Sequence, residues 1–426
     1  MVNRTIFALS SGRPPAAVSV IRLSGPRAHE AAASIAGPLP AVRAAGLRRL
    51  RDPASGALLD QAIVLRFDGP ASATGEDVVE FHCHGGRAIV DAVLAKLDAI
   101  EGLRPAVPGE FTRRAFENGR IDLTEAEGLA DLIEAETEAQ RKAALAVVEG
   151  ALSRVVEDWR GRVLVLSARA EQAIDYDDDD TPFDVLLAEE CESLARELGD
   201  WLARPRAELL KNGVLVVVAG PPNAGKSSLI NAISGEERVI VTDVPGTTRD
   251  SIEVPLSLHG VPIRLTDTAG LRTTYDKVEA IGVERAGKLV RSADILLWLG
   301  ELGDAPDHER MLVLHAKADL PERQEAPKGA IAVSSITHAG LDILLDRIES
   351  LARSLLPSDH AFALNRRQAG LVNDARDALA SAAVTGDLVL CAEALREARF
   401  AFDRMTGRAG VEDVLDALFS RFCLGK

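Results

Sequence analysis

The sequence has few aromatic residues, few cysteines and no long apolar stretch. Aromatic residues make up 4% of the 426 positions, and the four cysteines, Cys83, Cys191, Cys391 and Cys423, lie far apart without a CxxC pair. This spacing favours neither a disulfide framework nor a zinc ribbon. The apolar run at 214–219 is far shorter than the about 20 residues of a membrane-spanning helix, and the first residues contain no apolar signal stretch. We therefore expect a cytoplasmic protein.

Positive charge is also scarce. The chain has 49 lysines and arginines against 65 aspartates and glutamates, a net charge of −16, and residues 120–210 hold most of the acidic excess. This balance argues against a protein that coats nucleic acid with a broad basic surface, but a local basic patch remains compatible with it. At roughly 100 to 200 residues per domain, the length predicts two to four domains.

The pattern of apolar residues divides the chain into four segments. Residues 1–118 mix β-rich runs with alanine-rich helical stretches, which predicts a small α+β domain. Residues 119–210 carry apolar residues at spacings of three and four, which predicts long helices. Residues 211–356 alternate strands and helices, and residues 357–426 return to the helical pattern. We expect an α/β domain inserted into one helical bundle that two chain segments build.

Local signals add three expectations. Thr124 and Glu127 fit a capping box at the start of the first long helix. The acidic run at 177–180 is expected to be a solvated loop rather than a metal site. Alternation along a strand points Cys83 away from His82 and His84, so these residues should not share a metal ion. Cys191 and Cys391 are expected to be core residues of helices.

A phosphate-binding motif opens the third segment. The sequence GPPNAGKS at 220–227 matches GxxxxGK[ST] directly after a predicted strand and before a helical run. In such a loop the backbone N–H groups face the β-phosphate, Lys226 neutralises phosphate oxygens, and the Ser227 hydroxyl can bind Mg²⁺. The alternative, a glycine-rich turn that matches by chance, is disfavoured by the strand and the helix on either side.

Further motifs predict a nucleotide switch and a base site. In DTAG at 267–270, Asp267 can hold the Mg²⁺ shell and the Gly270 amide can sense a γ-phosphate, while GTTRD at 246–250 offers a threonine hydroxyl to Mg²⁺. HAKAD at 315–319 is similar to the NKxD motif, in which Asp319 would accept guanine N–H groups, and IAVSS at 331–335 resembles the segment behind the base. Ala316 replaces the usual asparagine, which can weaken guanine selectivity. Lys317 and Asp319 still favour GTP over ATP, and a charged surface turn is the alternative for this motif read alone.

These motifs do not identify the residue that orients the water molecule for GTP hydrolysis. Leu271 follows DTAG where Ras-like proteins carry a glutamine. Glu279 is a candidate for this task, but a solvated glutamate on a helix face would look the same. The role of Asn223 in the phosphate loop also has two interpretations. Asn223 can be a loop residue without a special role, or its side chain can bind a monovalent cation between the phosphates.

Taken together, the motifs resemble those of the MnmE (TrmE) family of tRNA modification GTPases over essentially the whole chain. The resemblance implies an N-terminal domain that binds tetrahydrofolate and dimerises, a helical domain, and a Ras-like G domain whose potassium-dependent pairing drives GTP hydrolysis. Its marks are RLSG at 22–25, TGED at 74–77, HGG at 84–86, PGEFTRRAF at 108–116, the phosphate-loop asparagine, GTTRD, DTAGLR at 267–272 and CLGK at 423–426.

The resemblance also implies roles for single residues. Ser227 and Thr248 would bind Mg²⁺, and Lys226 and Glu279 would serve catalysis. Potassium would lie among Asn223, Thr242, Val244 and Thr247. Folate would bind at Arg22, Glu80, Arg120 and Lys426, with Arg120 in place of the commoner lysine. Cys423 would lie near the one-carbon unit, with a buried structural thiol as the alternative. The residues expected at GTP are Asn223, Ala224, Gly225, Lys226, Ser227, Ser228, Thr242, Thr247, Thr248, Asp267, Thr268, Ala269, Gly270, Lys317, Asp319, Ser334 and Ser335.

The implied reaction places a carboxymethylaminomethyl or aminomethyl group on C5 of the tRNA wobble uridine. The flavoprotein MnmG would be the partner, and a methylene- or formyl-tetrahydrofolate would be the folate. Three other classes are weighed against it: a ribosome-docking switch of the Era or Der type, a folate enzyme with a purely regulatory G domain, and a dynamin-like scaffold. Proteins of the Era or Der type resemble this chain only in the G domain. No membrane-binding signature supports a dynamin-like scaffold.

Overall fold

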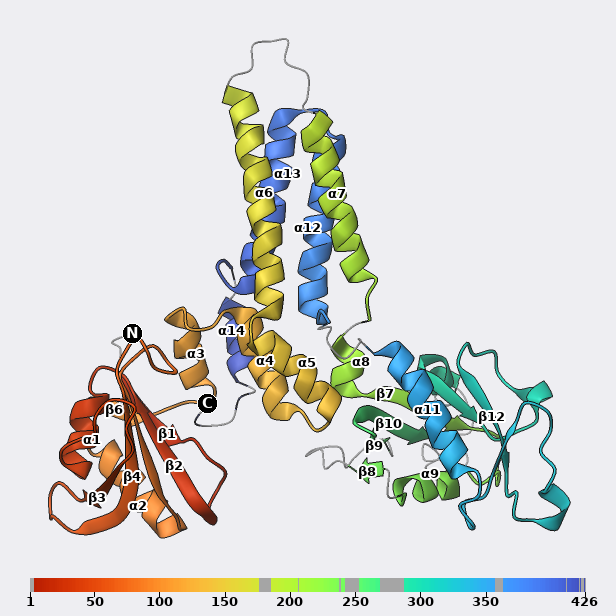
Figure 1. Ribbon diagram of the computed structural model, residues 1–426, viewed down its shortest axis with the longest axis horizontal. Coiled ribbons are helices and arrows are strands. Elements are labelled where there is room, and N and C mark those ends of the chain that lie inside the picture. Colours follow the sequence, from red (N-terminus) through yellow and green to blue (C-terminus); the bar gives the residue numbers. More distant parts are fainter. Residues whose placement is uncertain are drawn as a thin grey trace, which may run out of the picture. The chain divides into compact units, whose positions relative to one another are not determined.

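The computed structural model describes residues 4–175, 185–205, 207–236, 239–241, 253–268, 287–356, 363–410, 412–420, 422 and 425. The chain forms two compact units, and each is described by itself. Unit 1 consists of Met1–Ala130 and Asp403–Lys426, and unit 2 of Asp131–Phe402. Figure 1 labels their helices and strands. No helix in the described part of the chain has the length and apolar character needed to cross a membrane.

Unit 1 is built on a six-stranded sheet in the order β3-β4-β5-β2-β1-β6. Neighbouring strands are antiparallel, except that β1 and β6 are parallel. Helices α1 (Ala28–Ala36) and α2 (Arg87–Asp98) pack on one face, over a core that includes Ile21, Leu23 and Phe81. The predicted α+β domain is confirmed. The strands are β1 Thr5–Leu9, β2 Ala16–Ser24, β3 Gly46–Arg51, β4 Leu58–Phe67, β5 Val78–Gly85 and β6 Leu103–Pro105.

The C-terminal residues of the chain return to unit 1. Helices α3 (Glu110–Glu117), α4 (Leu123–Glu134) and α14 (Glu412–Phe419) share a second core, in which Phe419 and Phe422 are buried. Gly425 lies against the end of β1 with φ of 95°, where a Cβ atom would come within 2.1 Å of the Leu9 carbonyl oxygen. Only glycine fits this backbone approach.

The predicted capping box at Thr124 and Glu127 is wrong. Asp122 and Glu125 form the reciprocal pair instead: Asp122 Oδ1 accepts from the Glu125 amide at 2.9 Å, and Glu125 Oε2 accepts from the Asp122 amide at 2.8 Å. Thr124 is fully buried and donates its hydroxyl to Asp122 Oδ1 at 2.7 Å. Two overlapping residue pairs have the capping spacing, and the earlier pair begins the helix.

A buried arginine ties helix α3 to the sheet of unit 1. Arg114 donates to Glu76 Oε2 at 2.9 Å, to Glu110 Oε1 at 3.0 Å and to the Arg4 carbonyl oxygen at 2.8 Å. Burial alone would raise the pKa of Glu110, but hydrogen bonds from Arg104, Arg114 and the Val107 amide outweigh it and hold the pKa below its ordinary value. Both carboxylates are therefore matched by cations.

We expect Arg114→Ala to destabilise unit 1 by about 3–5 kcal/mol, because it leaves the buried Glu76 carboxylate without its cation and Glu110 with Arg104 alone. Arg113→Ala is the matched control. Arg113 lies on the same helix but is half-exposed, in ion pairs with Glu117 and Asp416, so its loss should change stability by about 0–1 kcal/mol. Hydrogen exchange of the β1 and β2 amides, followed by mass spectrometry, measures the difference, and equal exchange in the two variants would contradict it.

The α/β part of unit 2 contains a seven-stranded sheet in the order β13-β12-β11-β7-β10-β9-β8. The strand β7 (Val214–Ala219) is buried at every position, because parallel neighbours flank it and helices lie on both sides of such sheets. The other elements are α9 Lys226–Ser234, β8 Val239–Val241, β9 Glu253–Leu258, β10 Val261–Asp267, β11 Ile295–Trp298, η1 Leu302–Asp304, β12 Met311–Ala316, η2 Pro321–Arg323, β13 Ile331–Val333 and α11 Leu341–Leu355.

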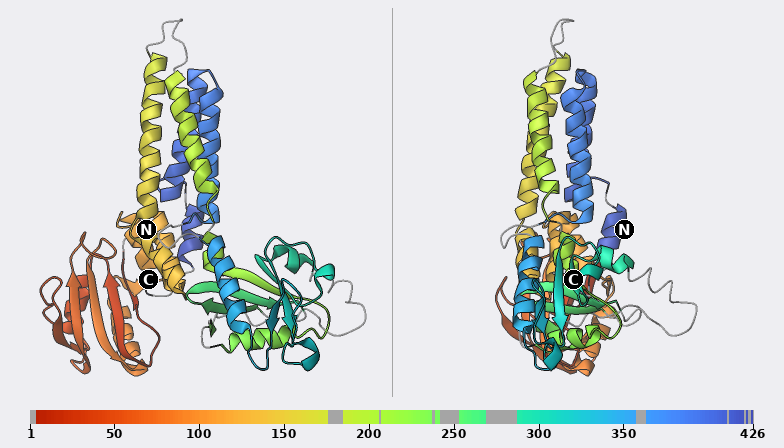
Figure 2. Two further views of the ribbon diagram at one scale, coloured as in Figure 1. Left: turned by 45° about the vertical axis from the view of Figure 1, so that its right-hand side comes forward. Right: turned by 90° about the vertical axis from the view of Figure 1, so that its right-hand side faces the viewer.

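The helical part of unit 2 is a bundle that two chain segments build, as predicted. Figures 1 and 2 show α6, α7, α12 and α13 side by side. Trp159 is fully buried there, with ring centroids 5.5 Å from Trp201 and 5.8 Å from Phe402. Cys191 and Cys391 are also buried, as expected. The helices are α5 Glu138–Val148, α6 Ala151–Asp175, α7 Val185–Leu202, α8 Ala207–Asn212, α12 Arg366–Val384 and α13 Leu388–Thr406.

Candidate functional site

The phosphate loop joins the central strand β7 to helix α9. Gly225 precedes the helix with φ of 98°, a conformation that suits glycine and lets the following amides face outward from the helix start. Lys226 is only 7% exposed and donates to the carbonyl oxygens of Gly220 at 3.0 Å and Pro221 at 2.8 Å. The loop thus folds around a buried cation, as the motif predicts.

Two oxygen ligands suitable for a magnesium ion meet beside this loop. The Ser227 hydroxyl donates to Asp267 Oδ2 at 2.6 Å, although the two residues lie 40 positions apart in the sequence. They meet because β7 and β10 are parallel neighbours, whose carboxyl ends share one edge of the sheet. Mg²⁺ prefers hard oxygen ligands and keeps open positions for water and phosphate, so this donor set fits it.

The predicted base-recognition segment is held by hydrogen bonds on two sides. Asp319 Oδ1 accepts a hydrogen bond from the buried Ser334 hydroxyl at 2.6 Å, and Ser334 Oγ in turn accepts from the amides of Ile336 and Thr337. Lys317 has φ of 61° and donates from Nζ to the Asn223 carbonyl oxygen at 3.0 Å. Lys317 therefore connects this segment to the phosphate loop.

A pocket of about 250 Å³ lies next to these groups. Ala316, Lys317 and Asp319 form part of its wall, and Ser228 and Ser335 also line it. Thr268 lies nearby on the sheet edge, where its hydroxyl donates to the Val218 carbonyl oxygen at 3.1 Å. The arrangement offers a carboxylate acceptor for a base at one end and a buried cation for phosphates at the other.

Several predicted site residues lie outside the described part of the chain, so their roles remain predictions. They are Thr242, Val244, Thr247, Thr248, Ala269, Gly270, Glu279, Cys423 and Lys426.

Two of the predicted folate residues are neighbours on the sheet of unit 1. Arg22 on β2 and Glu80 on β5 are register partners, with Arg22 Nε 2.9 Å and Nη2 2.8 Å from Glu80 Oε1. The guanidinium of Arg22 lies 5.7 Å from the centroid of the Phe111 ring. Arg120 is exposed, and its aliphatic stem lies against Gly75 rather than in this pair. The pair occupies the sheet face opposite to α1 and α2.

Strand alternation separates Cys83 from its histidine neighbours, as predicted. Cys83 is 1% exposed in the core, and burial raises the pKa of its thiol to about 12. On the other face, His84 Nδ1 lies 2.8 Å from Asp60 Oδ1, and His82 Nε2 lies 3.2 Å from Glu80 Oε2. Cys83 therefore lies on the sheet face opposite to His82 and His84.

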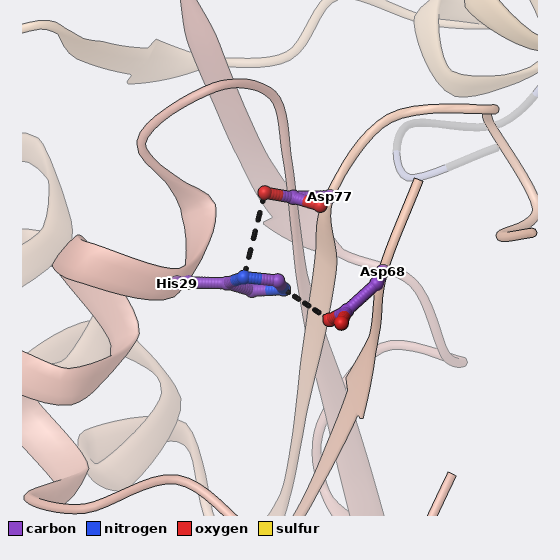
Figure 3. Close-up of side chains that lie close together, drawn as sticks. All are labelled: His29, Asp68 and Asp77. Carbon is purple, nitrogen blue, oxygen red and sulfur yellow. Dashed lines mark ion pairs between the residues drawn. The ribbon is translucent and has the colours of Figure 1, made fainter. Parts of the chain in front are cut away.

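A cluster of His29, Asp68 and Asp77 was not predicted from the sequence, because the three residues follow no known spacing (Figure 3). The carboxylates approach different ring nitrogens of His29: Asp68 lies 3.5 Å from Nε2 and Asp77 lies 3.4 Å from Nδ1. Asp68 is in addition held by Arg66 at 2.8 Å. The cluster fastens the start of α1 to the connection between β4 and β5.

Comparisons with known proteins agree with this geometry. Residues 5–120 match the model described as GTP-binding protein TrmE N-terminus, and residues 123–423 match the MnmE helical domain. The tRNA modification GTPase MnmE of Erythrobacter litoralis is 51% identical over 99% of this chain and 100% of its own length. The proteins of the same name from Rhizorhabdus wittichii and Zymomonas mobilis are 52% and 48% identical, over 99% of this chain and 96% and 100% of theirs. The chain belongs to the MnmE family of tRNA modification GTPases.

Proposed function

We propose that this GTPase is stimulated by potassium and works with the flavoprotein MnmG. In this proposal the pair adds a carboxymethylaminomethyl or aminomethyl group to C5 of the tRNA wobble uridine, with a one-carbon unit from a tetrahydrofolate. The observation that carries the GTPase part is the 2.6 Å contact between Ser227 and Asp267 beside the buried Lys226. The names of the relatives, tRNA modification GTPases, support the role in tRNA modification, and potassium, MnmG and folate rest on the family resemblance.

The residues of the chain would divide the work at GTP. Lys226 balances charge that develops on the transferred phosphate, in a buried position where electrostatic stabilisation is strong. Ser227 and Asp267, with Thr248, would hold Mg²⁺, which when bound neutralises the β- and γ-phosphate oxygens. Asp319 accepts N–H groups that guanine offers and adenine does not. The family resemblance assigns potassium to Asn223, Thr242, Val244 and Thr247, and the orientation of water to Glu279.

The proposed folate site lies in unit 1. The carboxylates of a folate tail need cations, and Arg22 and Arg120 supply two, with Lys426 as a third by resemblance. The stacking of Arg22 on Phe111 and its ion pair with Glu80 hold the guanidinium in one orientation. We also propose, from the resemblance, that two copies of this domain form a homodimer. The acidic character of the chain suits a division in which MnmG supplies much of the positive charge for tRNA.

Hydrolysis of GTP and ATP in potassium and in sodium buffer of equal ionic strength tests the proposal. We expect potassium to raise GTP turnover by about 10- to 100-fold, since a cation placed between the phosphates stabilises developing charge. We expect ATP to be used about 100-fold less well, because it leaves Asp319 without its donors. Equal rates in both salts would contradict the potassium site, and equal use of ATP would contradict guanine selection by Asp319.

A further inference from the structure

A positively charged pocket lies at one end of the helical bundle in unit 2. It has a volume of about 510 Å³, and the last residues of α7, the segment that follows, and the first half of α12 line it. We call it the arginine pocket, and its charged and aromatic lining residues are Trp201, Arg204, Arg366, Asp374 and Arg376. The lining contains three arginines and one aspartate, in a chain whose net charge is −16.

Two of the arginines are placed to meet a ligand. The Arg204 guanidinium lies 3.6 Å from the centroid of the Trp201 ring, so it forms a flat cationic surface stacked on an indole. Arg366 is exposed and has no ion pair among the described residues. Arg376 is paired with Asp377 at 2.6 Å, so its charge is partly balanced.

The stacked surface rests on a rigid support. Trp201 contacts the fully buried Trp159 edge to face, with centroids 5.5 Å apart and planes at 85°. A fixed guanidinium plane is a surface on which unstacked bases of single-stranded RNA bind, and arginines beside it suit the phosphates. The exposure of Arg204 and Arg366 favours contact with a strand over enclosure of one small ligand.

We propose that the arginine pocket binds one nucleotide unit of an RNA strand. The base stacks on Arg204 above Trp201, and Arg366 with Arg376 binds the adjoining phosphate. The choice of RNA rests on the proposed function in tRNA modification. A free nucleotide offers the same base and phosphate, so the experiment must separate the two sources.

The test uses the full-length chain and its affinity for a fluorescein-labelled tRNA transcript and a short labelled single-stranded RNA, measured by anisotropy over a series of potassium chloride concentrations. We expect Arg366→Glu to weaken RNA binding about 10-fold or more and to lower the salt slope by about one. Arg204→Ala should weaken it about 5- to 100-fold through loss of stacking. Arg366→Lys should retain most of the affinity.

The matched control is Arg196→Glu, which makes the same change of charge on the exposed side of α7, where Arg196 is loosely paired with Glu192 at 3.9 Å. If Arg196→Glu and Arg366→Glu weaken RNA binding equally, or if neither does, the pocket assignment is overturned.

A loss of uridine monophosphate binding with unchanged RNA binding overturns the choice of RNA. GTP turnover, which these variants should retain, reports separately on the proposed function: a wild-type chain without turnover would defeat that function and not the pocket.

Discussion

Replacement of Lys226 by alanine is expected to lower kcat for GTP hydrolysis by about 100- to 1,000-fold, the effect of removing one preorganised group that stabilises charge in the transition state. Lys226 is buried in the phosphate loop, where water screens its charge poorly. Single-turnover hydrolysis of GTP measures the change, because it separates the chemical step from product release.

The matched control for Lys226 is Lys328→Ala, which removes an exposed lysine from the same α/β domain and should leave turnover unchanged. Thermal unfolding followed by tryptophan fluorescence shows whether either variant has lost its fold, since Trp159, Trp201 and Trp298 all belong to unit 2. A folded Lys226→Ala variant with wild-type turnover would refute the assignment of Lys226 to phosphate.

Asp319→Ala is expected to weaken GTP binding by about 100-fold and to leave ATP binding unchanged. Hydrogen bonds to a charged group contribute about 1.5–3 kcal/mol each, and the carboxylate would accept from two guanine N–H groups. Titration calorimetry with a non-hydrolysable analogue of each nucleotide measures both affinities. Asp307→Ala removes an exposed carboxylate of the same domain and should change neither.

Ser334→Ala tests how much of the GTP affinity depends on the orientation of the Asp319 carboxylate and not only on its presence. The Ser334 hydroxyl donates to Asp319 Oδ1 at 2.6 Å and is itself fixed by two backbone amides. Its loss should weaken GTP binding by only about 5- to 10-fold, or roughly 1 kcal/mol, because the Asp319 carboxylate remains to accept the guanine N–H groups and only its orientation is less fixed. If Ser334→Ala matched Asp319→Ala, the carboxylate would act through the segment it holds and not through the base.

The meeting of Ser227 and Asp267 could be predicted because both belong to short motifs on parallel strands. Ser227 and Asp267 each follow a strand, and adjacent parallel strands bring their carboxyl ends together whatever lies between them. The contact of Lys317 with Asn223 was not predicted, because it depends on a left-handed backbone at Lys317 that no sequence pattern specifies.

Contacts between distant side chains were also beyond the sequence. Arg204 and Arg366 reach one pocket only because α7 and α12 pack together, and neither belongs to a motif. Likewise, both Asp122 with Glu125 and Thr124 with Glu127 have the spacing of a capping box. Thr124 is buried in the interior, and the pair that forms is Asp122 with Glu125. Residue chemistry suggested only Asn223 as a possible cation ligand, whereas the folate residues and the other potassium ligands came from family resemblance.

The packing of Gly425 against Leu9 has a consequence for how the protein is made. Unit 1 joins residues at the start of the chain to residues 403–425, which the ribosome adds after all of unit 2. The six-stranded sheet can begin to form early, but Phe419 and Phe422 cannot cover the apolar side chains of α3 and α4 until the ribosome has passed residue 422. Unit 2 is a continuous segment and can complete its fold first, so the nascent chain must carry an unfinished N-terminal unit while all of unit 2 is synthesised.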